Sequence, residues 1–344
     1  MSSNKDFIYE AIANLEKNVN IPISIDTTRG EYDAILSIKN YQFIVATKAA
    51  MRTTNQGLIL AQLEELRNIS NLPVIFIADY ISKEGANQLK ERGLNYIDTA
   101  GNAFISKGEL WIYVEGQKRK VKHHTNQSRA FQEAGTKIIF YLLNNSESLQ
   151  DSYREIAEKV NVSLGSVSNV MSELEERNYI LKTKTGRILK NKQELLERWV
   201  VAYNEILKPR ILRKRMRFID RATENDWKRI AQKITSTDIY QQDKQRENIL
   251  WGGEPGAALL TNSLRPEVFT LFTNYEIPLI ANRLRLVPDI NGKVYVYKKF
   301  WNNTSGSINV APALLIYADL VNSGYGRNIE IAKQILDNEL SYIQ

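Results

Sequence analysis

The chain has 344 residues, of which 43% are hydrophobic and 25% are charged, and its formal net charge is +7. This composition is that of an ordinary soluble protein, and the length allows two or three domains. The absence of cysteine excludes disulfides and cysteine-ligated metal centres, the N-terminus lacks a signal-peptide core, and no apolar run is long enough to span a bilayer. We therefore expect a soluble cytoplasmic protein with no cofactor and no membrane partner.

Residues 1–117 predict an α/β domain whose elements follow the order αβββαβαβββ. Helices are expected over residues 7–15, 56–69 and 84–92, and strands over 23–26, 33–38, 43–47, 73–78, 95–98, 103–106 and 110–114. The run 73–78 is almost continuously apolar, which is typical of a strand buried on both faces of a sheet.

This order of elements resembles the restriction-endonuclease-like fold. The active site of that fold has a carboxylate on one strand and an acid-x-Lys motif on the next, which hold a divalent metal and position the attacking water. Asp33 and Lys48 stand at the first acid and at the lysine, but Ala46 occupies the position of the middle acid. One remaining carboxylate is too few for a hard cation, so we expect a degenerate domain without catalytic or metal-binding residues. The alternative is a metal-dependent nuclease in which Asp26 or Glu31 replaces the missing ligand.

Residues 118–218 contain the most informative pattern, which is two short helices joined by a tight turn. Ser152 and Glu155 form a capping box, in which each side chain satisfies a backbone N–H at the start of the first helix. Ser163 is a favourable N-cap for the second helix. The apolar residues of the second helix recur at helical spacing and should bury one face: Val167, Val170, Met171 and Leu174. An upstream helix over residues 135–143 would complete a three-helix core.

The opposite face of the second helix suits contact with DNA. Its small or polar residues, near the helix N-terminus, are Ser163, Gly165, Ser166, Ser168 and Asn169. Such a face fits a major groove and offers short hydrogen-bonding groups to base edges. A hairpin follows, with Lys182, Lys184 and Arg187 around a turn at Gly186. The whole segment resembles a winged helix-turn-helix DNA-binding domain. A winged helix that makes only protein contacts is the alternative.

Two runs of cations flank this segment. Lys118, Arg119, Lys120 and Lys122 precede it in a basic linker, and Arg213, Lys214 and Arg215 follow it in an expected basic helix that ends the domain at residue 218. Cations on both sides of a DNA-reading module supply attraction to phosphates that does not depend on sequence. We expect these residues to contact the DNA backbone.

Residues 219–344 predict a C-terminal α+β domain. A strand, a glycine-rich turn and a helix are expected over 250–261, where Gly252, Gly253 and Glu254 form a candidate ligand loop for an anion. The loop lacks the lysine of a P-loop, and the next strand lacks the carboxylate pair of a nucleotidyltransferase, so the alternative is close packing of helix on strand. Segments 284–289 and 294–301 suggest a hairpin, and two helices should follow.

Several segments resemble the AbiEi-type transcriptional regulators, the antitoxins of type IV toxin–antitoxin (abortive infection) pairs. They are residues 251–261, 264–267, 283–289, 312–320 and 326–330, together with 93–103 in the N-terminal domain. The resemblance implies a winged helix joined to an antitoxin domain, repression of the protein's own operon, and opposition to a nucleotidyltransferase-like toxin without direct binding. Better-known members begin with the winged helix, whereas here it is central.

These observations predict a non-enzymatic, sequence-specific DNA-binding regulator, an autorepressing antitoxin. Its partner would be double-stranded operator DNA, with an inverted repeat bound by a homodimer or by repeated monomers. The alternatives are the metal-dependent nuclease and a scaffold that senses a nucleotide through its C-terminal domain.

Overall fold

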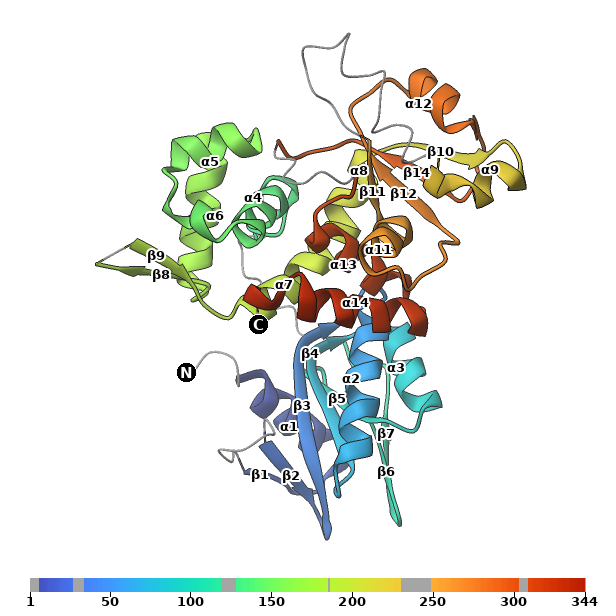
Figure 1. Ribbon diagram of the computed structural model, residues 1–344. Helices are drawn as coiled ribbons and strands as arrows, with labels where there is room; N and C mark the ends of the chain where they lie inside the picture. The colour runs from blue at the N-terminus through green and yellow to red at the C-terminus, as the bar shows by residue number, and fades with distance from the viewer. Residues whose placement is uncertain are drawn as a thin grey trace. The chain divides into compact units, whose positions relative to one another are not determined.

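The computed structural model describes residues 6–26, 34–118, 128–184, 186–229, 249–302 and 309–343 (Figure 1). The chain forms two compact units, Met1–Thr125 and Asn126–Gln344. Each unit contains a mixed sheet covered by helices. Within the described ranges, no helix is both long enough and apolar enough to cross a membrane.

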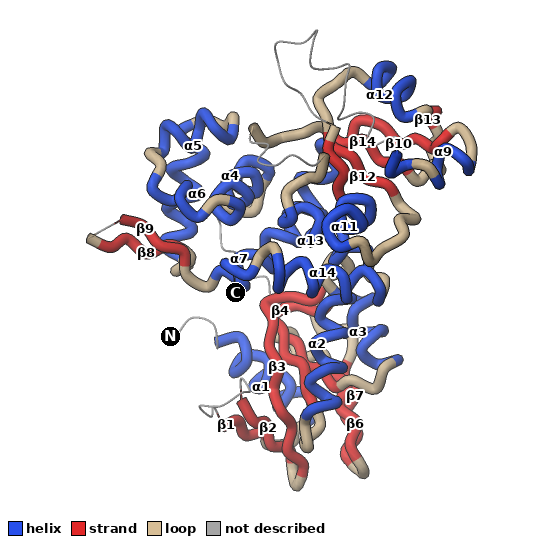
Figure 2. Tube along the Cα trace, in the orientation of Figure 1, coloured by secondary structure: helices blue, strands red, loops and turns tan. Residues whose placement is uncertain are grey.

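The first unit has the predicted order of elements. Its helices are α1 (Asp6–Val19), α2 (Gln56–Ile69) and α3 (Lys83–Glu91), and its strands are β1 (Ile23–Asp26), β2 (Ala34–Ile38), β3 (Tyr41–Met51), β4 (Val74–Ile81), β5 (Asn95–Asp98), β6 (Ala103–Lys107) and β7 (Leu110–Val114). All seven strands join one curled sheet in chain order (Figure 2). The pairs β3–β4 and β4–β5 are parallel and the others are antiparallel.

Strand β4 explains the continuous apolar run in the sequence. Ile75 and Ile77 face a core shared with α1, whereas Val74, Phe76 and Ala78 face a second core shared with α2 and α3. Both faces of the strand are therefore covered by helices, and every residue from Val74 to Ala78 is buried. The alternation of polar and apolar residues that marks a half-exposed strand is absent for this reason.

The second unit begins with the helix-turn-helix and hairpin that the sequence predicts. Its elements are α4 (Glu133–Asn144), η1 (Ser146–Gln150), α5 (Tyr153–Val160), α6 (Leu164–Glu176), β8 (Ile180–Thr183) and β9 (Gly186–Leu189). The capping box of Ser152 and Glu155 is present, and Asn161 ends α5 in the left-handed conformation. Strands β8 and β9 form an antiparallel pair. We refer to residues 133–189 as the winged module.

One helix continues from the winged module into the C-terminal sheet. It consists of α7 (Lys192–Ala202), a π-helical turn η2 (Tyr203–Leu207) and α8 (Lys208–Ile211), without a break in helical backbone. Trp199 is fully buried, stacks on Phe140 of α4 with ring centroids 5.9 Å apart, and donates to the carbonyl of Thr136 at 2.9 Å. On its other side it stacks on Tyr203 at 5.2 Å. This aromatic column fixes the helix against the winged module.

The C-terminal part of the second unit is a five-stranded sheet with helices. Its strands are β10 (Leu212–Phe218), β11 (Leu250–Gly252), β12 (Phe269–Phe272), β13 (Leu286–Pro288) and β14 (Val294–Tyr297), in the order β11-β12-β14-β10-β13. The helices are α9 (Arg221–Asn225), α11 (Gly253–Thr261), α12 (Ile277–Leu284), α13 (Ala313–Ser323), α14 (Gly326–Asn338) and η3 (Ser341–Ile343). The strand, glycine turn and helix expected over 250–261 are present as β11 and α11.

Two sequence predictions in this region are wrong, for one reason. The basic run after the winged module is helical only through Ile211 and then forms β10, and β13 and β14 do not pair with each other as a hairpin. Both pair with β10, which lies between them. Met216 and Phe218 are the buried residues of this strand, and the four cations Arg213, Lys214, Arg215 and Arg217 obscured the strand pattern in the sequence.

Candidate nucleic-acid interface

The start of α6 and the orientation of its outward face are determined by residues of the helix itself. The Ser163 hydroxyl accepts from the N–H of Ser166 at 3.1 Å, which starts the helix at Leu164. The four apolar residues predicted to form the inner face, Val167, Val170, Met171 and Leu174, are all buried. Because the inner face is fixed against the rest of the module, Gly165, Ser168 and Asn169 lie on the exposed side.

The predicted DNA-reading residues fall into two groups. Ser163 and Ser166 lie 2.8 Å apart through their hydroxyl oxygens and form the helix cap. The side chains of Ser168 and Asn169 are exposed and form no hydrogen bond within the described part of the chain. A Cβ at Gly165 would meet nothing within 4 Å, so the fold itself does not require glycine there. Without a side chain, Gly165 leaves the backbone of this helix turn open to close approach.

The hairpin is attached to the rest of the module near its turn, through Gly186 and Arg187. Gln150 donates to the carbonyl of Arg187 at 2.7 Å and accepts from the Arg187 N–H at 3.2 Å. The guanidinium group of Arg187 donates to the carbonyl of Asp151 at 2.6 Å and lies over the ring of Tyr153. A Cβ at Gly186 would lie 2.3 Å from Gln150 Oε1, so this glycine allows the close approach. Arg187 is therefore placed where it holds the wing.

Lys182 and Lys184 are the exposed cations of the wing. The ammonium group of Lys182 lies 2.8 Å from Glu175 Oε2, and this hydrogen bond raises the pKa of Lys182. A raised pKa keeps the lysine cationic at neutral pH and above. The two side chains of this pair are 64% and 24% exposed, and Lys184 is exposed at the turn of the hairpin.

Two exposed residues of α5 and α6 were missed by the sequence analysis. Leu164, the first residue of α6, is 48% exposed although it is apolar. An apolar side chain beside a major groove can contact the methyl group of thymine. Arg154 is exposed in the first turn of α5. The capping box of Ser152 and Glu155 could have indicated Arg154, because it places this residue in the first turn of α5.

The flanking cations lie in different surroundings. Lys118 is exposed, whereas Arg119, Lys120 and Lys122 lie outside the described residues. Arg213, Lys214 and Arg215 belong to β10. The Arg213 guanidinium donates to the carbonyl of Tyr275 at 2.5 Å, and Arg215 Nε donates to the carbonyl of Gly292 at 2.6 Å. These two arginines join segments of the C-terminal sheet, and Lys214 between them is exposed.

The residues at the positions of a nuclease active site are Asp33, Ala46 and Lys48. Ala46 and Lys48 lie on β3, paired with Phe76 and Ala78 of β4, and Asp33 lies outside the described residues. Within the described ranges, no group of three or more His, Asp or Glu side chains could hold a metal ion. Ala46 supplies no ligand atom, so the acid-x-Lys motif is incomplete.

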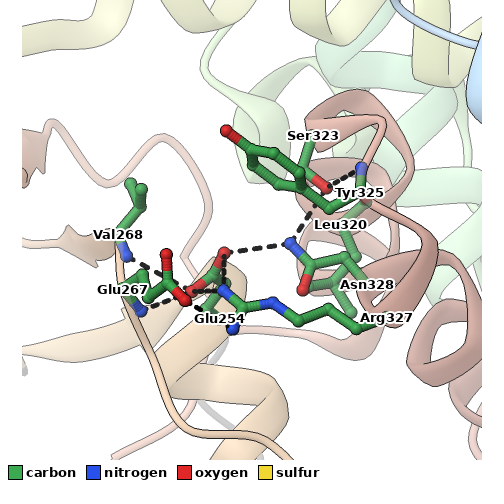
Figure 3. A network of polar contacts seen from close by, with 8 residues as sticks. All are labelled: Glu254, Glu267, Val268, Leu320, Ser323, Tyr325, Arg327 and Asn328. Atoms are coloured by element: carbon green, nitrogen blue, oxygen red, sulfur yellow. Dashed lines mark hydrogen bonds and ion pairs between the residues drawn. The ribbon is translucent and has the colours of Figure 1, made fainter.

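The candidate ligand loop of the C-terminal sheet is occupied by contacts of the protein itself. Figure 3 shows the buried carboxylate of Glu254, on α11, surrounded by donors. It accepts from the backbone N–H of Glu267 at 2.6 Å and of Val268 at 3.2 Å. From α14, Asn328 Nδ2 donates to it at 2.9 Å, and the Arg327 guanidinium lies 3.4 Å away. Glu254 therefore joins α11 to α14, which agrees with the packing alternative rather than with an anion site at Gly252 and Gly253.

Comparison with known proteins finds two families, and each matches part of the second unit. Residues 187–341, from β9 to η3, match a protein family described as "Transcriptional regulator, AbiEi antitoxin, Type IV TA system". Residues 131–207, which span α4 to η2, match the family described as "Firmicute plasmid replication protein (RepL)". No curated protein and no solved structure matches the chain. Over its C-terminal half, the chain is thus similar to the AbiEi family of antitoxins and transcriptional regulators of type IV toxin–antitoxin systems.

Proposed function

We propose that the protein is a sequence-specific DNA-binding regulator that represses its own operon as the antitoxin of a type IV toxin–antitoxin pair. The observation that carries this proposal is the exposed face of α6, where Ser168 and Asn169 form no hydrogen bond within the described part of the chain and a Cβ at Gly165 would meet nothing within 4 Å. The similarity of the C-terminal half to AbiEi antitoxins supports the regulatory role. The protein acts by binding, and its functional counterpart is a nucleotidyltransferase-like toxin that it does not contact.

In this proposal α6 enters the major groove. Ser168 and Asn169 face base edges, Gly165 allows the backbone to approach, and Leu164 supplies an apolar contact. Lys182 and Lys184 bind the adjacent phosphates, and Arg154 binds the backbone on the other side of the groove. Exposed Lys118 and Lys214 remain candidates for further phosphate contacts. The operator is an inverted repeat bound by two copies of the chain.

The direct test is binding to the DNA upstream of the protein's own gene. Fluorescence anisotropy with a labelled duplex should give a dissociation constant of about 10⁻⁸ M or tighter at physiological salt, which is the usual range of specific complexes. A scrambled duplex should bind at least about 1,000-fold more weakly. Absence of binding to any duplex at low ionic strength would overturn the proposal.

The wing should contribute affinity without sequence preference. Replacing Lys182 and Lys184 by glutamine removes two phosphate contacts, so the slope of log K against log salt should fall in magnitude by about 1.8. Binding should weaken similarly for specific and scrambled duplexes, measured by anisotropy over a salt series. The double replacement of exposed Lys293 and Lys298 by glutamine makes the same change in net charge outside the winged module. An equal fall in slope in this control would show that net charge alone, and not the wing, is responsible.

Asn169 should contribute preference for one base pair. An asparagine amide can bond to both N6 and N7 of adenine, and the Asn169→Ala variant loses both bonds. Discrimination at that position should fall by about 1–3 kcal/mol, measured by competition among duplexes with every single-base change. The control is Asn338→Ala at the exposed end of α14. Uniform loss of affinity across all duplexes would contradict direct reading by Asn169.

A further inference from the structure

Strand β7 lies at the end of the seven-stranded sheet, where one of its edges faces away from the other strands (Figure 2). Within the described residues it pairs only with β6, and no side chain bonds to its backbone. Its sequence is LWIYV, which contains no charged residue and no proline, and its register with β6 has no bulge. Native edge strands are usually blunted by one of these features, because free N–H and C=O groups attract another strand.

The opposite edge of the same sheet is protected in this way. Strand β1 begins directly after Pro22 and ends at Asp26. The N–H of Ile23, its first residue, donates to Glu16 Oε1 at 2.7 Å. The two edges therefore differ, and β7 is the edge whose sequence permits addition of a strand.

Two exposed aromatic side chains lie on one face of β7. Trp111 is 67% exposed and Tyr113 is 47% exposed, whereas Leu110 and Ile112 between them belong to the buried core on the other face. Both rings stand edge-on to Phe104 of β6, with centroids 5.4 Å and 6.5 Å away, which fixes their positions. A fully covered aromatic side chain buries about 150–250 Å², so these two offer about 250 Å² of exposed surface in each chain.

This strand is complementary to a second copy of itself. If two β7 strands pair antiparallel around a twofold axis at Ile112, all five residues of each strand gain a partner. Trp111 then lies opposite the partner's Tyr113 on the aromatic face, and Leu110 lies opposite the partner's Val114 on the core face. Such aromatic and aliphatic cross-strand pairs stabilise sheets. A surface that binds its own copy closes after two chains, whereas pairing of β7 with β1 would continue into a fibre.

The size and the charges of this contact indicate a weak dimer. The rings of two copies contribute about 500 Å², against about 1,600 Å² in a standard interface, and only the short strands add to this area. Glu109 and Glu115 border the strand and would face each other at both ends of the pair. Lys90, 4.0 Å from Glu115, offsets this repulsion in part. The pairing is therefore confined to the apolar residues 110–114.

We propose that a second copy of the chain docks on β7, so that two copies join their sheets edge to edge in a weak homodimer. The inference rests on the proposed function in one respect: an inverted repeat has a twofold axis, which a dimer of this kind shares. At the operator, the first bound copy would raise the effective concentration of the second.

Analytical ultracentrifugation of the full chain without DNA tests the dimer. Over a concentration series, the mass should rise reversibly from 39.5 kDa toward twice that value. Hydrogen exchange followed by mass spectrometry gives a second measurement. Exchange over residues 110–114 should slow as the concentration rises, because N–H groups at the free edge become bonded to the second copy.

Two matched variants locate the contact. Trp111→Lys places like charges close to the twofold axis, so this variant should stay monomeric and exchange rapidly at every concentration. Ile69→Lys makes the same change of charge at a 73% exposed position at the end of α2, and it should dimerise as the wild type does. Both variants should bind a duplex with a single half-site equally well, which separates loss of the dimer from loss of DNA binding.

The inference is overturned if the wild type stays monomeric throughout the series, or if it forms larger open assemblies. It is equally overturned if Trp111→Lys dimerises like the wild type, or if Ile69→Lys abolishes the dimer to the same extent. A dimer that binds no duplex would instead refute the proposed function and leave this inference standing.

Discussion

Replacing Glu254 by glutamine is expected to lower the free energy of unfolding of the second unit by about 3–5 kcal/mol. The carboxylate is 5% exposed and accepts bonds from two backbone N–H groups and from the side chains of α14. Removing one partner of a buried ionic network leaves the others without compensation. Urea denaturation followed by circular dichroism measures the change.

Glu267 provides the matched control. It binds the same arginine, with Arg327 Nη1 at 2.7 Å from Glu267 Oε1, but its side chain is 62% exposed. Glu267→Gln should therefore cost only about 0–1 kcal/mol, which is the range of surface ion pairs. A similar loss of stability in the two variants would contradict the prediction, because it would show that burial of Glu254 does not determine the cost.

Replacing Trp199 by alanine is expected to cost about 3–5 kcal/mol, the range for truncation of a buried aromatic residue. The indole ring fills the space between Phe140 and Tyr203, and its N–H bonds to a buried carbonyl that would lose its partner. The loss should appear as a lower urea midpoint, measured by circular dichroism, because the contact between α4 and α7 is weakened.

Trp111→Ala is the matched control, because Trp111 of β7 is 67% exposed. Removing the same side chain there should change the stability of the first unit by less than about 1 kcal/mol. A large loss in the Trp111 variant, or a small one in the Trp199 variant, would contradict the assignment of the aromatic column as the attachment between helix and winged module.

Local patterns in the sequence were sufficient to predict most of the helices and strands. Helices with a side-chain cap, such as α5 behind Ser152 and α6 behind Ser163, begin where their capping residues predict. The inner face of α6 follows from helical spacing alone. Strand β4 was predicted because a run that is apolar at every position has to be covered on both sides.

Interactions between distant segments could not be predicted in this way. Arg187 looks like a phosphate contact in the sequence, but its partners Gln150 and Asp151 come from η1 and the segment after it. Arg213 and Arg215 likewise bond to carbonyls of other segments of the C-terminal sheet. Glu254 looked like part of a ligand loop because its partners on α14 are far along the chain. A charged residue alone does not indicate whether it faces solvent, DNA or a distant carbonyl.

The π turn at Tyr203–Leu207 sets the rotational phase between the winged module and the C-terminal sheet. A π turn holds one residue more than an α turn, and one residue corresponds to about 100° of rotation about a helix axis. Directly after the turn, Lys208 Nζ lies 2.7 Å from Asp319 Oδ1. Deleting a single residue from this turn would let the helix become regular throughout, but Lys208 would then point away from Asp319. Sequence length at this point is therefore more tightly constrained than side-chain identity at most surface positions of the helix.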